Sequence, residues 1–209
     1  MEYLTHYLIE KKDALEICQK LKAEKSSWQD GKKTAGSHAA KIKNNFQLDR
    51  NSEISIGLKE IIINKITSNP LIKSFTLPNI IHGIMFTKSI AGNGYGMHID
   101  NPYMPSGRSD LSFTLFLNEP EDYQGGELCI QTINDIKKIK LSAGEMIIYP
   151  STKLHAVAKV QEGERFVCVG WIQSYVKSNE DRNFLFGLDA GAKGLLAKHG
   201  RSDELDLIF

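Results

Sequence analysis

Two short segments of the chain carry side chains that could bind one metal ion. The first is His98-Ile99-Asp100, at the end of a predicted strand. Because successive side chains of a strand alternate between its two faces, His98 and Asp100 would project to the same side. The second is His155, in another predicted strand that a β-sandwich could bring opposite the first. Together they would supply two imidazole nitrogens and one carboxylate oxygen, and would leave three positions of an octahedron open.

This set of donors favours iron over zinc. Two histidines and one carboxylate with open positions are typical of non-haem Fe(II) oxygenases. Zinc favours a closed, four-coordinate site, often with thiolates, and none of the three cysteines lies near these ligands in the sequence: Cys18, Cys129 and Cys168. A His-x-Asp tripeptide alone would more often be a surface histidine beside an N-capping aspartate. The second histidine and a following arginine make the metal site the better interpretation.

Arg165 begins a further predicted strand ten residues after His155. A planar guanidinium forms bidentate hydrogen bonds to a carboxylate and keeps its charge. A dicarboxylate held on the metal through one end would need such a partner at its other end. The alternative, an exposed arginine in a turn, would be favoured if Arg165 stood alone, and its spacing from His155 makes the binding role preferable.

The elements that would position these residues are mostly short strands. Turn signals such as Gly92-Asn93-Gly94 and Gly125-Gly126 separate eight runs with strand character, which indicates an antiparallel sandwich or jelly roll. We expect strands at Ile80–Thr87, Gly96–Asp100, Leu111–Leu117, Glu127–Gln131, Lys137–Leu141, Glu145–Tyr149, Leu154–Lys159 and Arg165–Gln173.

Helices are expected on both sides of these strands. Apolar residues follow a helical spacing from Lys11 to Lys25 and from Ser52 to Ile66. Pro70 is expected to end any helix there. The polar stretch Trp28–Asn45 predicts an irregular loop, and the segment Asn183–Phe209 predicts a helix and tail.

Composition limits the class of protein. The 209 residues, 41% hydrophobic and 24% charged, are typical of a soluble globular protein with room for one domain. The net charge of +1 disfavours a nucleic-acid partner. An odd number of cysteines without a CxxC motif disfavours a disulfide framework, and no signal peptide or membrane-spanning run is recognisable. We therefore expect a cytoplasmic protein with no membrane partner, of open oligomeric state.

Longer motifs give a more specific expectation. They are W-x-D-G at Trp28–Gly31, K-x-K-N-N at Lys41–Asn45, YGMHID at Tyr95–Asp100, RSDLSFTLFL at Arg108–Leu117, YQGGEL at Tyr123–Leu128, LSAGEMIIYPSTKLHAV at Leu141–Val157 and WIQS at Trp171–Ser174. In these motifs and their order, over most of its length, the chain resembles the Fe(II)- and 2-oxoglutarate-dependent dioxygenases, specifically the PKHD-type hydroxylases of the prolyl 4-hydroxylase-like group.

The resemblance implies a mainly β (α+β) fold, a double-stranded β-helix (jelly roll) with N-terminal flanking helices and a C-terminal helical tail. Residues 1–209 would form a single domain, with helical and loop support over 1–75, the dioxygenase core over 76–177 and a helix and tail over 178–209. It also implies that His98, Asp100 and His155 bind Fe(II) and that Arg165 anchors 2-oxoglutarate. O₂ would be the other co-substrate, and L-ascorbate (vitamin C) would keep the iron reduced.

The implied activity is hydroxylation of an unactivated C–H bond, with release of succinate and CO₂. A protein or peptide substrate and a small molecule are equally compatible with the sequence. One alternative is an oxidative nucleic-acid demethylase, which usually carries a second arginine and an asparagine soon after the co-substrate arginine, where this chain has RFVCVGW. Another is a catalytically silent jelly-roll binding module. A third is a cupin-type enzyme such as an isomerase, whose usual set of three histidines and a glutamate is absent.

Three further positions bear on the co-substrate and the substrate. Relatives carry a tyrosine on the strand before the His-x-Asp that can help to hold the co-substrate, but Ser89 aligns there. Either Ser89 substitutes for it weakly, or another residue such as Lys88 or Thr114 takes over. The loop Asn101–Ser109 is expected to form part of the substrate mouth, with Tyr103, Met104 and Arg108 offered to a ligand. The polar run Lys43-Asn44-Asn45 is as compatible with the substrate mouth as with loop structure.

Overall fold

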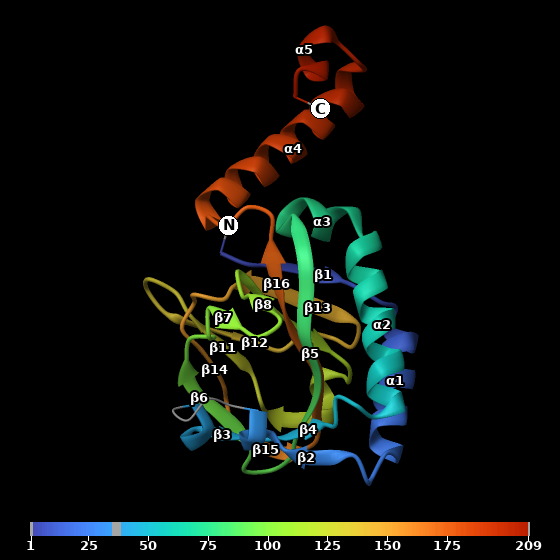
Figure 1. Ribbon diagram of the computed structural model, residues 1–209, viewed down its shortest axis with the longest axis vertical. Helices are drawn as coiled ribbons and strands as arrows, with labels where there is room; N and C mark the ends of the chain where they lie inside the picture. The colour runs from blue at the N-terminus through green and yellow to red at the C-terminus, as the bar shows by residue number, and fades with distance from the viewer. Residues whose placement is uncertain (1, 35–38, 209) are drawn as a thin grey trace.

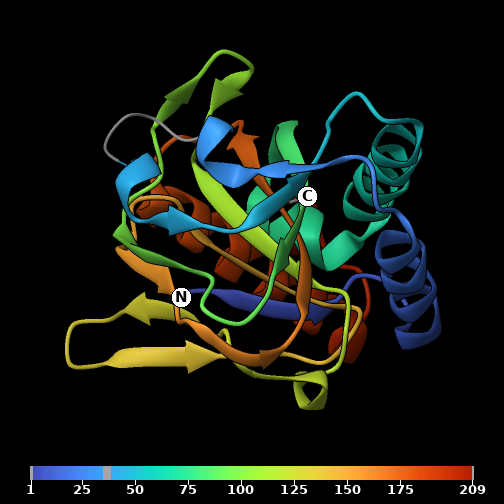
Figure 2. The same ribbon diagram turned by 90° about the horizontal axis from the view of Figure 1, so that it is seen from below.

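Two antiparallel sheets form the body of the molecule, and helices cover one of them (Figures 1 and 2). The computed structural model describes residues 2–34 and 39–208. Within these residues the larger sheet has seven strands in the order β1-β13-β9-β16-β5-β4-β2, and the smaller sheet has five in the order β12-β11-β14-β6-β3. The predicted fold class, mainly β with helices, is confirmed.

The strands of the larger sheet are, in sheet order, β1 (Leu4–Tyr7), β13 (Glu145–Pro150), β9 (Leu111–Phe116), β16 (Arg165–Ser174), β5 (Pro78–Ser89), β4 (Phe46–Leu48) and β2 (Trp28–Asp30). Those of the smaller sheet are β12 (Ile136–Ile139), β11 (Leu128–Gln131), β14 (His155–Val157), β6 (Gly94–His98) and β3 (Lys43–Asn44). Two separate pairs join β7 (Tyr103–Met104) to β8 (Gly107–Arg108) and β10 (Tyr123–Gly125) to β15 (Val160–Gly163). All eight predicted strands are present, with ends that differ by at most two residues.

Strand β9 is buried along its whole length in the larger sheet, between β13 and β16. Its alternate side chains serve two environments, as the pleat requires. Leu111 and Leu115 belong to the hydrophobic core shared with the helices. Ser112 and Thr114 line a cavity between the two sheets. A single strand therefore connects the core to the polar side chains of the site.

Helices α1 (Lys11–Ala23) and α2 (Glu53–Ser68) pack on the outer face of the larger sheet (Figure 2). The C-terminal helix α4 (Asn179–His199) leaves the sheets and carries the short α5 (Asp203–Asp206) at its far end (Figure 1). The predicted C-terminal helix is thus present, and Phe209 lies outside the described residues. No helix in the described part of the chain is both long and apolar enough to cross a membrane. The assignment of residues 1–209 to one domain stays a prediction.

Helix α2 ends at Ser68, just before Pro70, as predicted, but a further helix that the sequence analysis did not expect follows it. Helix α3 (Pro70–Thr76) begins at this proline. Proline suits the first helical position because its missing N–H has no helical partner there. The side chain of Asn69 accepts a hydrogen bond from the Ile72 backbone N–H at 3.0 Å and caps the new helix.

The prediction of an irregular loop over Trp28–Asn45 is wrong at both ends. Residues Trp28–Asp30 pair with β4 as strand β2, and Lys43–Asn44 pair with β6 as strand β3. Short 3₁₀ helices occupy Gly31–Thr34 and Ala39–Lys41, and residues 35–38 lie outside the described part. Such short edge strands carry too few residues for an alternating pattern to be recognised.

Asn118 fixes the start of β16, the strand that opens with Arg165. Its side chain is 1% exposed, donates to the Glu164 carbonyl at 2.9 Å and accepts from the Phe166 N–H at 2.9 Å. These two backbone groups flank Arg165 in the sequence. The amide therefore sets where Arg165 enters the sheet.

We expect Asn118→Ala to lower the free energy of unfolding by about 1–3 kcal/mol, because it removes the partner of two backbone groups beside the buried strand. Urea unfolding followed by far-UV circular dichroism measures the change. Asn134→Ala, at an exposed turn position, is the control and should change stability by no more than about 0.5 kcal/mol. Equal effects of the two substitutions would contradict this role of Asn118.

Candidate metal centre

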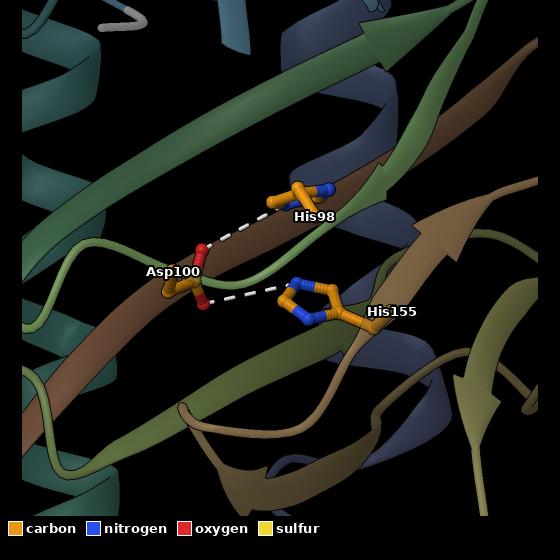
Figure 3. A group of neighbouring side chains, drawn as sticks. All are labelled: His98, Asp100 and His155. Carbon is orange, nitrogen blue, oxygen red and sulfur yellow. Dashed lines mark ion pairs between the residues drawn. The ribbon is translucent and has the colours of Figure 1, made fainter. Parts of the chain in front are cut away.

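His98, Asp100 and His155 lie together and point toward one another (Figure 3). His98 on β6 and His155 on β14 are direct cross-strand partners. The Nε2 atom of His98 is 3.8 Å from Asp100 Oδ1, and that of His155 is 3.7 Å from Asp100 Oδ2. These separations are too long for hydrogen bonds. One ligand atom from each residue lies within 4.8 Å of the other two, so a single ion could contact all three.

Asp100 is oriented by a contact from the larger sheet. Strand β6 ends at His98, two residues earlier than predicted, so strand alternation does not by itself place the carboxylate. The Ser112 hydroxyl on β9 donates to Asp100 Oδ2 at 2.5 Å. Its oxygen lies 2.7 Å from the Ser151 hydroxyl, which must then donate to it. Two buried serines thus hold the carboxylate toward the histidines.

Both histidines present the nitrogen that a metal needs. His98 Nδ1 lies 2.8 Å from the Gly96 carbonyl, and His155 Nδ1 lies 2.9 Å from the Lys153 carbonyl. Because a carbonyl can only accept, each Nδ1 carries the hydrogen, and in the neutral ring Nε2 keeps its lone pair. Such outer contacts commonly fix the tautomer of metal-binding histidines.

The surroundings of His98 favour its neutral form. Burial disfavours the charged form of the His98 ring, and the neighbouring His155 disfavours it further. Together they lower the pKa of His98 to about 4. The ring also stacks on Tyr95, with 3.6 Å between the ring centroids. A neutral, fixed imidazole is the form that binds a metal ion.

Arg165 is buried in the same cavity, with 3% of its surface exposed. Its guanidinium carbon lies 5.5 Å from the centroid of the Phe116 ring, and its Nε–H has no hydrogen-bond partner among the described residues. Burial lowers the pKa of this arginine. Gly126, at φ +70°, leaves room for it, since a Cβ there would lie 3.0 Å from Arg165 Cδ. The Gly125-Gly126 turn therefore has a packing role as well as a backbone one.

The cavity that joins these residues has a volume of about 880 Å³. It lies between the two sheets and is lined by His98, Asp100, His155 and Arg165. This volume is in the upper part of the range typical of small-molecule sites. It is large enough for a small co-substrate and part of a second molecule.

Two of the three residues named as replacements for the expected co-substrate tyrosine line the cavity. Ser89 lies opposite Arg165 in the pairing of β5 with β16 and lines the cavity, as does Thr114. Lys88 does not line it, and its Nζ lies 4.9 Å from the centroid of the Trp28 ring. Sequence reasoning missed Tyr149, which also lines the cavity and whose ring centroid is 5.1 Å from that of His155. The sequence feature that could have indicated this role is its position six residues before His155.

The loop Asn101–Ser109 forms the β7–β8 hairpin at the cavity. Met104 lines the cavity, whereas Tyr103 is 66% exposed and does not. The expectation that Arg108 offers its charge to a ligand is wrong, because its Nε donates to Asp110 Oδ1 at 2.7 Å and its guanidinium also bonds to the Ser174 carbonyl. The role of the loop in substrate binding stays a prediction.

Comparison with known proteins defines the class. Residues 84–173 match the family model described as the 2OG-Fe(II) oxygenase superfamily. Among solved structures, the fold is similar to a prolyl hydroxylase from Trichoplax adhaerens, with a TM-score of 0.60 and 16% identity, covering 88% of this chain and 86% of that one. It is also similar to a Pseudomonas putida prolyl-4-hydroxylase, with a TM-score of 0.57 and 18% identity, covering 84% and 94%. These likenesses establish the jelly-roll fold.

Curated relatives define the family. A PKHD-type hydroxylase of Prochlorococcus marinus strain NATL1A is 79% identical over all 209 residues and 95% of its own length. Another, from strain MIT 9313, is 63% identical over the same shares. The chain belongs to the PKHD-type hydroxylases, within the 2-oxoglutarate and Fe(II) oxygenases. It is an oxygenase enzyme, as the motifs in the sequence indicate.

We expect Ser112→Ala to weaken Fe(II) binding about 10- to 100-fold, the usual loss when a contact that orients a metal ligand is removed. Anaerobic titration calorimetry with Fe(II) measures the affinity. Ser151→Ala removes only the partner of Ser112 and should have a smaller effect. Wild-type affinity in Ser112→Ala would show that Asp100 is held by other means.

Proposed function

We propose that this protein hydroxylates an unactivated C–H bond of a peptidyl or small-molecule substrate and converts 2-oxoglutarate and O₂ to succinate and CO₂. The observation that carries the proposal is the buried Arg165 guanidinium, which opens on the same cavity as His98, Asp100 and His155. A buried charge is costly unless it is paired, and the Arg165 Nε–H has no partner in the described part of the chain. A carboxylate at this place would satisfy it.

The residues present fit both absent groups. His98, Asp100 and His155 would hold Fe(II), since two neutral imidazoles and one carboxylate suit this ion and leave positions for other ligands. Arg165 would hold the distal carboxylate of 2-oxoglutarate through a charge-assisted, bidentate pair. The dicarboxylate could then span from the metal to the arginine. The distal carboxylate would compensate the buried positive charge of Arg165.

Bound Fe(II), with 2-oxoglutarate and O₂, supplies the oxidative decarboxylation and the oxidant for the C–H bond. The chain's own residues supply orientation. Ser112 holds the Asp100 carboxylate, and the Gly96 and Lys153 carbonyls hold the two imidazoles. L-ascorbate as the reductant that keeps the iron active is part of the proposal.

We expect His98→Ala, Asp100→Ala and His155→Ala each to abolish Fe(II) binding and O₂-dependent formation of succinate while the protein stays folded. The reason is that each variant removes one of three ligands. Calorimetry with Fe(II), succinate assays and circular dichroism measure the three properties. Full succinate formation in any of these variants would refute the proposed centre. Absence of succinate formation in the metal-loaded wild type would favour the catalytically silent binding module.

We expect Arg165→Lys to keep Fe(II) binding but to raise the KM for 2-oxoglutarate roughly 5- to 150-fold. Lysine preserves the charge and loses the bidentate fork, a cost of about 1–3 kcal/mol for a charge-assisted hydrogen bond. Arg165→Ala should have a larger effect. The initial rate of 2-oxoglutarate consumption, measured against its concentration, gives the KM, and an unchanged KM in Arg165→Ala would make the co-substrate assignment wrong.

A further inference from the structure

Three more cations line the cavity, at a part of its wall that the proposed chemistry does not use: Lys33, which is exposed, Lys43 on β3, and Arg50, which follows β4. Of these, Lys43 is buried and Arg50 contacts another side chain of the cavity. Among the described residues that line the cavity, Asp100 is the sole carboxylate. This excess of positive charge is local, since the chain as a whole carries a net charge of only +1.

Lys43 lies close to the metal side of the cavity. It is 7% exposed, and its strand pairs with β6 so that Lys43 is opposite Tyr95. Its Nζ is 5.5 Å from the centroid of the Tyr95 ring, and the other partner of that ring is His98. One aromatic ring therefore connects the ammonium group to a proposed metal ligand.

Arg50 lies at the cavity with a weak acceptor beside it. Its Nη2 is 2.8 Å from the Sδ atom of Met85, which also lines the cavity. A thioether is a poor partner for a guanidinium. Arg50 takes part in none of the ion pairs found among the described residues. Its strong donors remain available to a ligand that enters the cavity.

The proposed centre does not require these two charges. Fe(II) and Arg165 together carry three positive charges, and Asp100 with 2-oxoglutarate carries three negative ones. The loaded centre is therefore electrically neutral with neutral histidines. Lys43 and Arg50 add positive charge to a cavity that is already balanced.

The two cations also disfavour each other. Burial, followed by the charge of Arg50, lowers the pKa of Lys43 to about 8. Asp100 and Asp30 oppose this effect and do not cancel it. An anion bound near both groups would remove the repulsion and pair with the guanidinium, and oxyanions offer the matching acceptors.

We propose that Lys43 and Arg50 form a binding site for an oxyanion of the prime substrate, a carboxylate or a phosphate, on the cavity wall beside Tyr95. This inference rests on the proposed function and adds the substrate class to it. The site would hold the charged end of the substrate while a C–H bond a short distance away faces the metal. Hydroxylation of a neutral or cationic substrate would be disfavoured.

The test uses wild-type protein loaded with Mn(II) and 2-oxoglutarate without oxygen. Paramagnetic relaxation by Mn(II) reports binding of three probes near the metal: inorganic phosphate by ³¹P NMR, and hexanoate and its neutral analogue hexanamide by ¹H NMR. We expect saturable relaxation of phosphate, hexanoate or both, and a Kd for hexanamide at least tenfold weaker than that of the better anion. The anion that binds better distinguishes a phosphate-bearing from a carboxylate-bearing substrate.

Substitutions of Lys43 and Arg50 test whether these two residues form the anion site. Lys43→Met and Arg50→Gln should each raise the Kd of the better anion at least tenfold, and Arg50→Glu should abolish its relaxation. Lys88→Met is the matched control, because Lys88 lies over Trp28 and Phe46 and outside the cavity, and it should leave the Kd unchanged. Arg50 is exposed, so its variants should fold even if Lys43→Met does not.

Several results would overturn the inference. They are no relaxation of either anion, equal binding of hexanamide, an equal effect of Lys88→Met, or no effect of the Arg50 variants. A loss of 2-oxoglutarate affinity in Arg50→Gln as large as its loss of affinity for the anion probe would also overturn it, by assigning these cations to the co-substrate. If wild-type protein binds 2-oxoglutarate through Arg165 but binds neither phosphate nor hexanoate, this inference alone fails. If it does not bind 2-oxoglutarate at all, the proposed function fails as well.

Discussion

The pairing of β6 with β14 is the constraint on which the site depends. It sets His98 directly opposite His155, and a slip of one residue would turn one of the two rings to the other face of the sheet. The register shifts between this pair and the next, Tyr95 with Val157, so β6 contains one residue more than β14 over this stretch. Such irregularities bend a strand and re-aim its side chains. Asp100 then needs Ser112, from the other sheet, to complete the group.

Charge balance links this group to the larger sheet. Arg165 is buried at the start of β16, where Asn118 fixes the backbone on both sides of it. Burying a guanidinium whose Nε–H lacks a partner among the described residues opposes folding, and in the proposed function the same charge would bind a dicarboxylate. On that proposal, co-substrate binding would stabilise the folded protein. The proposed metal ligands and the proposed co-substrate residue thus line one cavity from different sheets.

The sequence predicted best what depends on local spacing. The eight strands could be recognised because periodicity and turn residues act over a few positions. The alternation expected to place His98 and Asp100 on one face does not apply as such, because β6 ends at His98. Ser112 and Tyr149 were missed as site residues, since a serine or tyrosine in a buried strand looks ordinary until its cross-sheet neighbour is known. Arg108 was misassigned for the same reason, because its partner Asp110 could not be distinguished from any exposed acid. Pro70 shows a different limit: it follows the end of one helix, as predicted, and also begins the next, which is capped by Asn69.

The proposed metal centre and the proposed oxyanion site occupy different parts of the chain. The superfamily match spans residues 84–173 and includes the three proposed ligands and Arg165, which all lie on or directly beside strands of the two sheets. Lys43 and Arg50 precede this match and belong to the short β3 and to the segment after β4. Edge strands and connections tolerate change better than a buried strand such as β9, because fewer packing contacts depend on them. If Lys43 and Arg50 select the substrate as proposed, a change at these two positions would leave the proposed metal centre in place, because its ligands lie on other elements.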